Sequence, residues 1–283
     1  MSDTVTEVAD AELLPPVPVD RNPLKGVLLV MGAALLFALA DVTTKHLAQR
    51  FNVPLVVALR YGVNLALLLV FLWPRHGRAL FVTERTGLVI LRGGFLALAS
   101  LTMGIALTLM PVAETVAIIY IAPILVMLLS VVLLKEKVGR AGWIGAAAGF
   151  AGVLLIVRPG SGLVPLGVAL AVANAFCAAA YHLTTRSLAR TESAAAMMVW
   201  TALVGTVIFG AMLPWSLDVP APTWTDAGLM LGLGALATGG HYLFTLAYRE
   251  ARASLLAPVN YLHLVWAAVL GWLVFSQVPD ALG

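Results

Sequence analysis

Long apolar segments recur along almost the whole chain and are separated mostly by short polar connections. A helix that crosses a bilayer needs about 20 apolar residues, at a rise of 1.5 Å per residue. With 61% hydrophobic and only 11% charged residues, the chain carries more apolar surface than a soluble core of this size could bury. We therefore predict an all-α integral membrane protein with nine spans, near residues 24–48, 55–73, 88–109, 112–134, 142–157, 163–189, 194–213, 224–248 and 253–275.

The first of these segments returns later in the chain at a constant offset of 141 residues. Residues 26–48 and 167–189 are identical at nine aligned positions, among them Gly26 and Gly167, Thr44 and Thr185, and Ala48 and Ala189. Repeats in a membrane protein are typical of a transporter built from two halves. The same offset pairs the fifth span with a segment beginning near Gly283, so we expect a ten-helix fold with nine helices in this sequence and the tenth missing from it.

An odd number of spans per half means that the two halves enter the membrane from opposite sides and form an inverted repeat of two five-helix halves. The expected organisation is a disordered cytoplasmic tail at 1–20, a first repeat at 21–158 and a second, truncated repeat at 163–283. Basic residues support this topology, because 13 fall on the side where the chain starts, counting Arg92 and Arg186 as loop residues, and three on the other. By the positive-inside rule the N-terminus is cytoplasmic.

Charge and cysteine content narrow the function classes further. The net charge of +3 does not indicate a nucleic-acid partner, because the basic residues lie in short loops between apolar runs. The single cysteine, Cys177, excludes an internal disulfide. No His-Glu-x-x-His or comparable spacing indicates a metal site, no P-loop is present, and no catalytic constellation can be assembled. We expect no enzyme activity, no metal and no cofactor.

Three ionisable residues within apolar runs are candidates for coupling or substrate binding, because a charge inside a membrane is costly to bury. Asp41 could instead form an ion pair with Lys45 four residues later, and Glu114 could be an exposed acid at a helix start. Arg60 lies deeper in its span, where it could neutralise Asp41 or Glu114 or meet the carboxylate of a substrate.

Prolines and aromatic side chains indicate where a cavity could lie. Pro123 and Pro258 each free a carbonyl four residues earlier, which hydrocarbon tolerates only where that backbone faces protein or a wet cavity. Each could also be a simple buried kink. Histidines in three spans could bind substrate, carry protons or be structural. The full set of candidate substrate-binding residues is Arg60, Tyr120, Tyr181, His182, His241, Tyr242, His263 and Trp266, and the candidates for coupling or gating are Asp41, Glu114, Pro123 and Pro258.

Several motifs resemble those of the EamA-type drug/metabolite transporters. They are Pro111-Val-Ala-Glu-Thr-Val-Ala with Pro123, Leu133-Leu-Lys-Glu136, and in the second half Ala253-Ser-Leu-Leu-Ala and Gly271-Trp-Leu-Val-Phe. The resemblance covers residue 24 to the end. It departs from the family pattern where Glu136 is matched in the second repeat by Ser276-Gln277. It implies a central cavity and alternating access without ATP, as facilitated or proton-linked export.

Within that family the chain is similar to bacterial inner-membrane exporters of aromatic and other amino acids. We therefore expect a secondary transporter that exports amino acids, embedded in the lipid bilayer of the bacterial inner membrane and compatible with a monomer. Another metabolite or drug, such as a nucleoside, a sugar or a cationic drug, is the alternative substrate class. A membrane-embedded enzyme lacks the residues it would need, and a scaffold without transport activity would leave solute flux unchanged.

Overall fold

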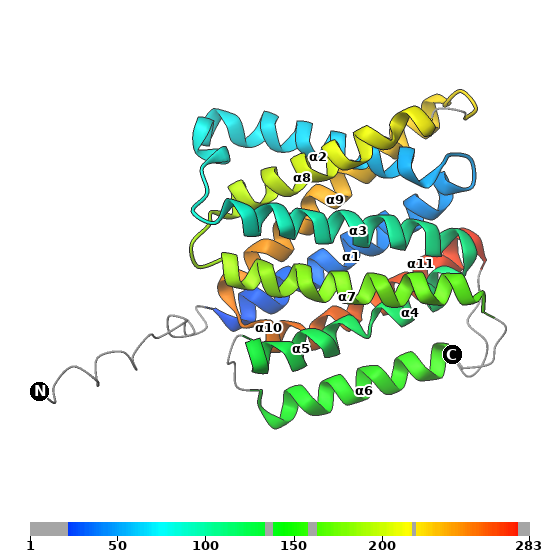
Figure 1. The fold of residues 1–283 in the computed structure, drawn as a ribbon. Coiled ribbons are helices and arrows are strands. Elements are labelled where there is room, and N and C mark those ends of the chain that lie inside the picture. Colours follow the sequence, from blue (N-terminus) through cyan, green and yellow to red (C-terminus); the bar gives the residue numbers. More distant parts are fainter. Residues whose placement is uncertain (1–21, 134–137, 158–162, 217–218, 277–283) are drawn as a thin grey trace, which may run out of the picture.

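A computed structural model describes residues 22–133, 138–157, 163–216 and 219–276. Every regular element in these ranges is helical, and the helices run roughly alongside one another as a bundle (Figure 1). The tail predicted at 1–20 lies outside the described residues. The helices are α1 (Pro23–Ala48), α2 (Val53–His76), η1 (Gly77–Phe81), α3 (Thr86–Leu109), α4 (Val112–Ile119), α5 (Ala122–Leu133), α6 (Arg140–Val157), α7 (Pro165–Leu188), α8 (Ala194–Met212), η2 (Leu213–Trp215), α9 (Trp224–Glu250), α10 (Ala253–Leu256), η3 (Pro258–Tyr261) and α11 (Leu262–Phe275).

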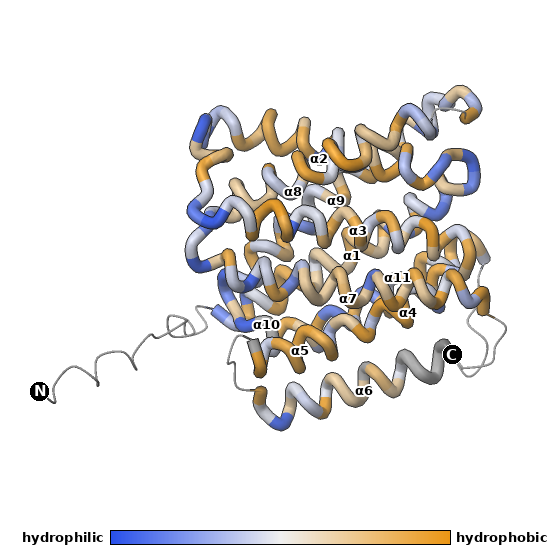
Figure 2. Tube along the Cα trace, viewed as in Figure 1, coloured by the Kyte–Doolittle hydropathy of each residue, from blue (hydrophilic) through white to orange (hydrophobic). Residues whose placement is uncertain are grey.

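The predicted all-α membrane fold is confirmed. Within the described part of the chain, eight helical segments are long and apolar enough to cross a bilayer. The predicted fifth span corresponds to the 18-residue helix α6, which is not one of these eight segments and runs alongside the others at the edge of the bundle (Figure 1). Apolar residues follow the helices, and polar residues gather largely at their ends (Figure 2). Two spans are each built from shorter pieces, α4 with α5, and α10 with η3 and α11.

Local sequence signals set several helix starts. The side chain of Asn22 accepts a hydrogen bond from the backbone N–H of Lys25 at the start of α1, and that of Ser193 does the same for Ala196 at the start of α8. Thr223 and Asp226 form a reciprocal capping box at the start of α9. Each contact satisfies backbone donors that the first helical turn leaves without partners.

The repeat is visible in how the helices pair. α1 packs along α9, and α3 packs along α7. The offset of 141 converts α1 into α7 and α3 into α9, so these are two copies of one antiparallel helix pair. α2 and α8, which are also equivalent, pack on each other, and Gly205 of α8 lies so close to the ring of Tyr61 that a Cβ there would overlap it.

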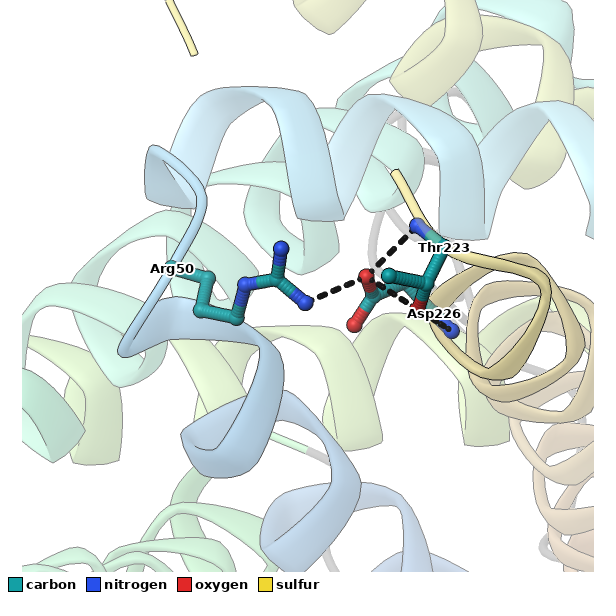
Figure 3. Close-up of polar contacts among 3 residues, drawn as sticks. All are labelled: Arg50, Thr223 and Asp226. Atoms are coloured by element: carbon teal, nitrogen blue, oxygen red, sulfur yellow. Dashed lines mark hydrogen bonds and ion pairs between the residues drawn. The ribbon is translucent and has the colours of Figure 1, made fainter. Parts of the chain in front are cut away.

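Ion pairs hold α1 and α9 together at both of their ends. At the face of the bundle where α1 begins, here called the N-terminal face, Lys25 Nζ lies 2.6 Å from Glu250 Oε1. At the opposite face Arg50 Nη1 lies 2.6 Å from Asp226 Oδ2, the same carboxylate oxygen that accepts from the backbone and hydroxyl of Thr223 (Figure 3). The two helices are therefore fixed to each other along their length.

Candidate substrate-binding site

A cavity of about 160 Å³ lies between the two halves. Its walls come from α1, α2, α3 and α4 of the first half and from α7, α9 and α11 of the second. Most of the lining is apolar, with a few polar groups that converge on the space, which is the usual composition of a small-molecule site. The lining residues are Phe37, Asp41, Arg60, Leu96, Ala99, Ser100, Met103, Val116, Ile119, Asn174, Ala178, His241 and His263.

Asp41 and His263 are in contact at the cavity wall, and the contact is an ion pair when the imidazole is protonated. His263 Nε2 lies 2.9 Å from Asp41 Oδ2, and both side chains are about 15% exposed. The two atoms are buried and are not aligned as a hydrogen bond with any described residue. Among those residues Lys45 does not pair with Asp41, and its ammonium instead donates to the carbonyls of Leu107 and Met110. The simple ion pair within α1 that the sequence allowed is therefore replaced by a contact between α1 and α11.

Arg60 brings a positive charge to the same cavity. Its guanidinium donates to the hydroxyl of Ser100 on α3 and lies over the ring of Tyr61, 5.1 Å from its centroid. These contacts use few of the five N–H donors that a guanidinium carries. On the α7 side, the amide nitrogen of Asn174 donates to the carbonyl of Ala99. The cavity thus holds one cationic group, one ion pair and neutral hydrogen-bonding groups.

The two broken spans meet beside the ion pair. α4 ends at Ile119 and α5 begins at Ala122, while η3 ends at Tyr261 and α11 follows directly. Tyr120 and Tyr261 are equivalent under the 141-residue offset. Their rings are in contact, tilted by 38° with centroids 5.2 Å apart, and the Tyr261 hydroxyl donates to the Tyr120 carbonyl. The ring of Tyr120 also lies 5.7 Å from that of His263, so the break of each half helps to enclose the ion pair.

The remaining predicted site residues are spread over different environments. His182 is packed away from the cavity against Phe244 and Tyr248, and Tyr242 and Trp266 are exposed on the outside of the bundle, 42% and 38%. Glu114 has one buried carboxylate oxygen without a hydrogen-bond partner among the described residues. Three of the predicted residues, Tyr120, Pro123 and Pro258, lie at the helix breaks and do not line the cavity. Tyr181 does not line it either, and its hydroxyl accepts a hydrogen bond from Arg92.

The placement of Arg92 and Arg186 in loops is wrong. Arg92 lies in α3 and is 1% exposed, and Arg186 lies in α7 and is 5% exposed. The guanidinium of Arg92 bonds to neutral groups on α7 and α8, which shield it from lipid. Its position inside the predicted span 88–109 was a sequence signal for this burial. Ser100, Asn174 and Phe37, which also face the cavity, carry no charge that would have marked them.

Comparisons with known proteins agree with this architecture. The EamA-like transporter family matches residues 24–158 and again 165–282. The chain is 28% identical to the riboflavin transporter of Vibrio cholerae, covering 92% of this chain and 88% of that protein, and 30% identical to the riboflavin transporter of Rhizobium johnstonii, covering 90% and 84%. It is 26% identical to the pseudopaline exporter CntI of Pseudomonas aeruginosa, covering 91% and 90%.

A solved crystal structure shares the fold, with a TM-score of 0.73 and 21% identity over 90% of each chain. The family matches the chain twice, once in each half of the bundle, and the two matches together cover most of the sequence, with a break between residues 158 and 165. The cavity described above lies between these two matched halves. This chain therefore belongs to the EamA-like transporter family and is a small-molecule transporter of the membrane rather than an enzyme.

Proposed function

We propose that this protein exports amino acids, aromatic and other neutral ones, by alternating access through the cavity between its halves. The observation that carries the proposal is the set of groups on that cavity. Arg60 offers donors to a carboxylate, the carboxylate of Asp41 can attract an ammonium, and the ring of Phe37 offers an apolar face to a side chain. A zwitterion with an apolar body matches all three.

Cavity size favours a solute of this class over a larger one. Sites for drug-sized ligands usually enclose about 300–1,000 Å³, whereas this cavity encloses about 160 Å³. An amino acid is a better match to that volume than a multi-ring cofactor.

The position of the cavity supports alternating access. Asp41 lies seven residues before the end of α1 and Arg60 seven residues after the start of α2, so each is about 10 Å from the opposite face. On the N-terminal side the bundle is closed by a buried cluster that includes Val30, Tyr181, Phe244 and Tyr248. If the N-terminus is cytoplasmic, as the basic loops indicate, the cavity of this conformation lies toward the outside of the cell.

The Asp41–His263 pair is the proposed coupling site. A histidine and an aspartate in contact can hold one proton between them, and the change in charge alters how strongly α1 and α11 attract each other. In the proposed cycle one proton enters the cell on this pair while one amino acid leaves. No nucleotide is needed.

Riboflavin is the second candidate, and the names of two similar proteins favour it. Transport measurements on purified protein in liposomes separate the two candidates. We expect uptake of radiolabelled phenylalanine, tryptophan or leucine above that of empty vesicles, and no uptake of riboflavin. Uptake of riboflavin without uptake of amino acids would make riboflavin the substrate in place of amino acids. Uptake of neither would refute both candidates.

A further inference from the structure

Two buried arginines lie at matching depths from opposite faces of the bundle. Arg60 is seven residues from the start of α2, which enters from the opposite face, and Arg92 is six residues from the start of α3, which enters from the N-terminal face. At a rise of 1.5 Å per residue, the backbone of each arginine lies about 10 Å from the face at which its helix begins. The two charges therefore flank the middle of the protein.

Arg92 is buried with neutral partners. Its Nε donates to the hydroxyl of Thr185 at 2.7 Å, one Nη to the carbonyl of Met197 at 3.0 Å and to the hydroxyl of Thr201, and the other Nη to the hydroxyl of Tyr181 at 2.9 Å. No carboxylate of the described residues lies within ion-pair distance of it. A buried charge is costly unless an opposite charge compensates it, so a structural role alone leaves this positive charge without a reason.

The internal repeat relates the surroundings of the two arginines. Under the 141-residue offset Arg60 corresponds to Thr201, and its partner Ser100 corresponds to His241. Arg92 bonds directly to Thr201, and it reaches His241 through the hydroxyl of Tyr181, which lies 3.3 Å from His241 Nδ1. Arg92 therefore lies beside Thr201 and His241, the residues of the second repeat that are equivalent to Arg60 and Ser100 of the first.

His241 stands between the two environments. It lines the main cavity together with Arg60, and it also lines a second, enclosed space with Arg92, Tyr181 and Thr201. That second space measures about 10 Å³, which is close to the volume needed for a single water. It adjoins the main cavity at Leu96 and His241, which line both spaces.

We propose that Arg92 binds the carboxylate of the substrate in the conformation open to the N-terminal face, as Arg60 does in the conformation described here. The inference rests on the proposed function and extends it to a substrate requirement. When inverted repeats exchange their arrangements, the pocket around Thr201 and His241 opens as the pocket around Arg60 and Ser100 closes. The carboxylate leaves one guanidinium and meets the other, so each access state offers the anion a compensating charge. Solutes with an amide or ester in place of the carboxylate lack this attraction on both sides.

The test measures half-saturation constants from each face separately, in right-side-out and inside-out membrane vesicles. We expect R60Q to raise KM at the opposite face by about 10- to 150-fold, the size of one charge-assisted hydrogen bond, and to leave KM at the N-terminal face within twofold. R92Q is expected to do the reverse. Because R92Q removes four buried contacts and can prevent folding, R92K provides a second variant, with an expected rise of about three- to tenfold at the N-terminal face.

Arg186 supplies a matched control. It is also a buried arginine near the N-terminal face, it lines neither space, and it donates to the carbonyl of Tyr248. R186Q can lower the amount of folded protein but should leave KM unchanged at both faces.

Equal effects of the Arg92 variants at both faces, or an unchanged KM in R92K, would overturn the assignment. Wild-type transport of amino acid amides as rapid as that of the acids would overturn the carboxylate requirement while leaving a working transporter. Wild-type vesicles that move no amino acid would instead refute the proposed function, and this inference with it.

Discussion

Replacing Asp41 by asparagine should separate proton coupling from transport. The carboxylate and the His263 imidazole are 2.9 Å apart. At that distance, with an effective dielectric constant of 20, an ion pair attracts with about 6 kcal/mol, and desolvation of the two ions offsets several kcal/mol each. Because the attraction and the desolvation largely offset each other, the ion pair can form and break during a transport cycle. Asparagine keeps the shape of the side chain but cannot hold the negative charge.

The expected magnitude follows from one proton on the pair. Each pH unit across the membrane is worth 1.36 kcal/mol per proton, which is a tenfold solute gradient for exchange of one proton against one amino acid. Proteoliposomes with a lumen one pH unit more acidic than the medium should therefore accumulate the amino acid about tenfold. The D41N variant should reach no more than equal concentrations on the two sides.

A second measurement on the same vesicles guards against a variant that is simply inactive. With unlabelled amino acid inside and labelled amino acid outside at equal pH, exchange needs no net proton movement. D41N should retain this exchange at a raised half-saturation constant, since the substrate loses the attraction of Asp41 for its ammonium but is still bound by Arg60 and Phe37. Undiminished pH-driven accumulation in D41N would refute the coupling role of the pair. Accumulation driven by an alkaline lumen would reverse the proposed direction of proton flow.

Three further predictions follow from individual contacts. Phe37→Leu should raise KM for aromatic amino acids by about 2- to 12-fold, the size of one aromatic pair, and leave leucine transport unchanged, as measured by competition assays. His263→Ala should reduce flux far more than Trp266→Ala, because His263 lines the cavity and Trp266 is on the outer surface; equal losses in the flux assay would contradict this placement. Gly205→Ala should destabilise the protein by about 1–3 kcal/mol, because its Cβ overlaps the Tyr61 ring, and lower the Tm in detergent, whereas Gly210→Ala, which meets no atom within 4 Å, should not.

The sequence predicted the helices and their duplication because both depend on patterns along the chain. Apolar length marks a span wherever it occurs, and the offset between Gly26 and Gly167 is visible without any fold. Which face of a helix turns inward is a different matter. His263 and Trp266 are only three residues apart, yet one lines the cavity and the other is exposed. Lipid is as apolar as the protein interior, so hydrophobicity does not distinguish these faces in a membrane helix.

Arg92 illustrates a second limit. Its burial depends on Thr185, Tyr181 and Thr201, which are about 90 to 110 residues away and carry no charge. Nothing along the chain marks these uncharged partners, so Arg92 was counted with the basic residues of the preceding loop. Asp41 shows the same effect, since its partner was sought at Lys45 within α1 and lies at His263 on α11. Contacts between helices decide both cases.

The ion pairs at the two ends of α1 and α9 have a consequence for motion. Lys25 with Glu250 and Arg50 with Asp226 link the ends of two helices that also pack along each other, so we expect α1 and α9 to move as one unit. The equivalent pair is α3 with α7, and the cavity lies along the seam between the two pairs, with residues of all four helices in its lining. A disulfide engineered within one pair should leave turnover intact, while one that joins α1 to α3, which belong to different pairs and are in contact, should arrest it. A compound that wedges into that seam from the lipid could then inhibit the carrier without competing with its cargo.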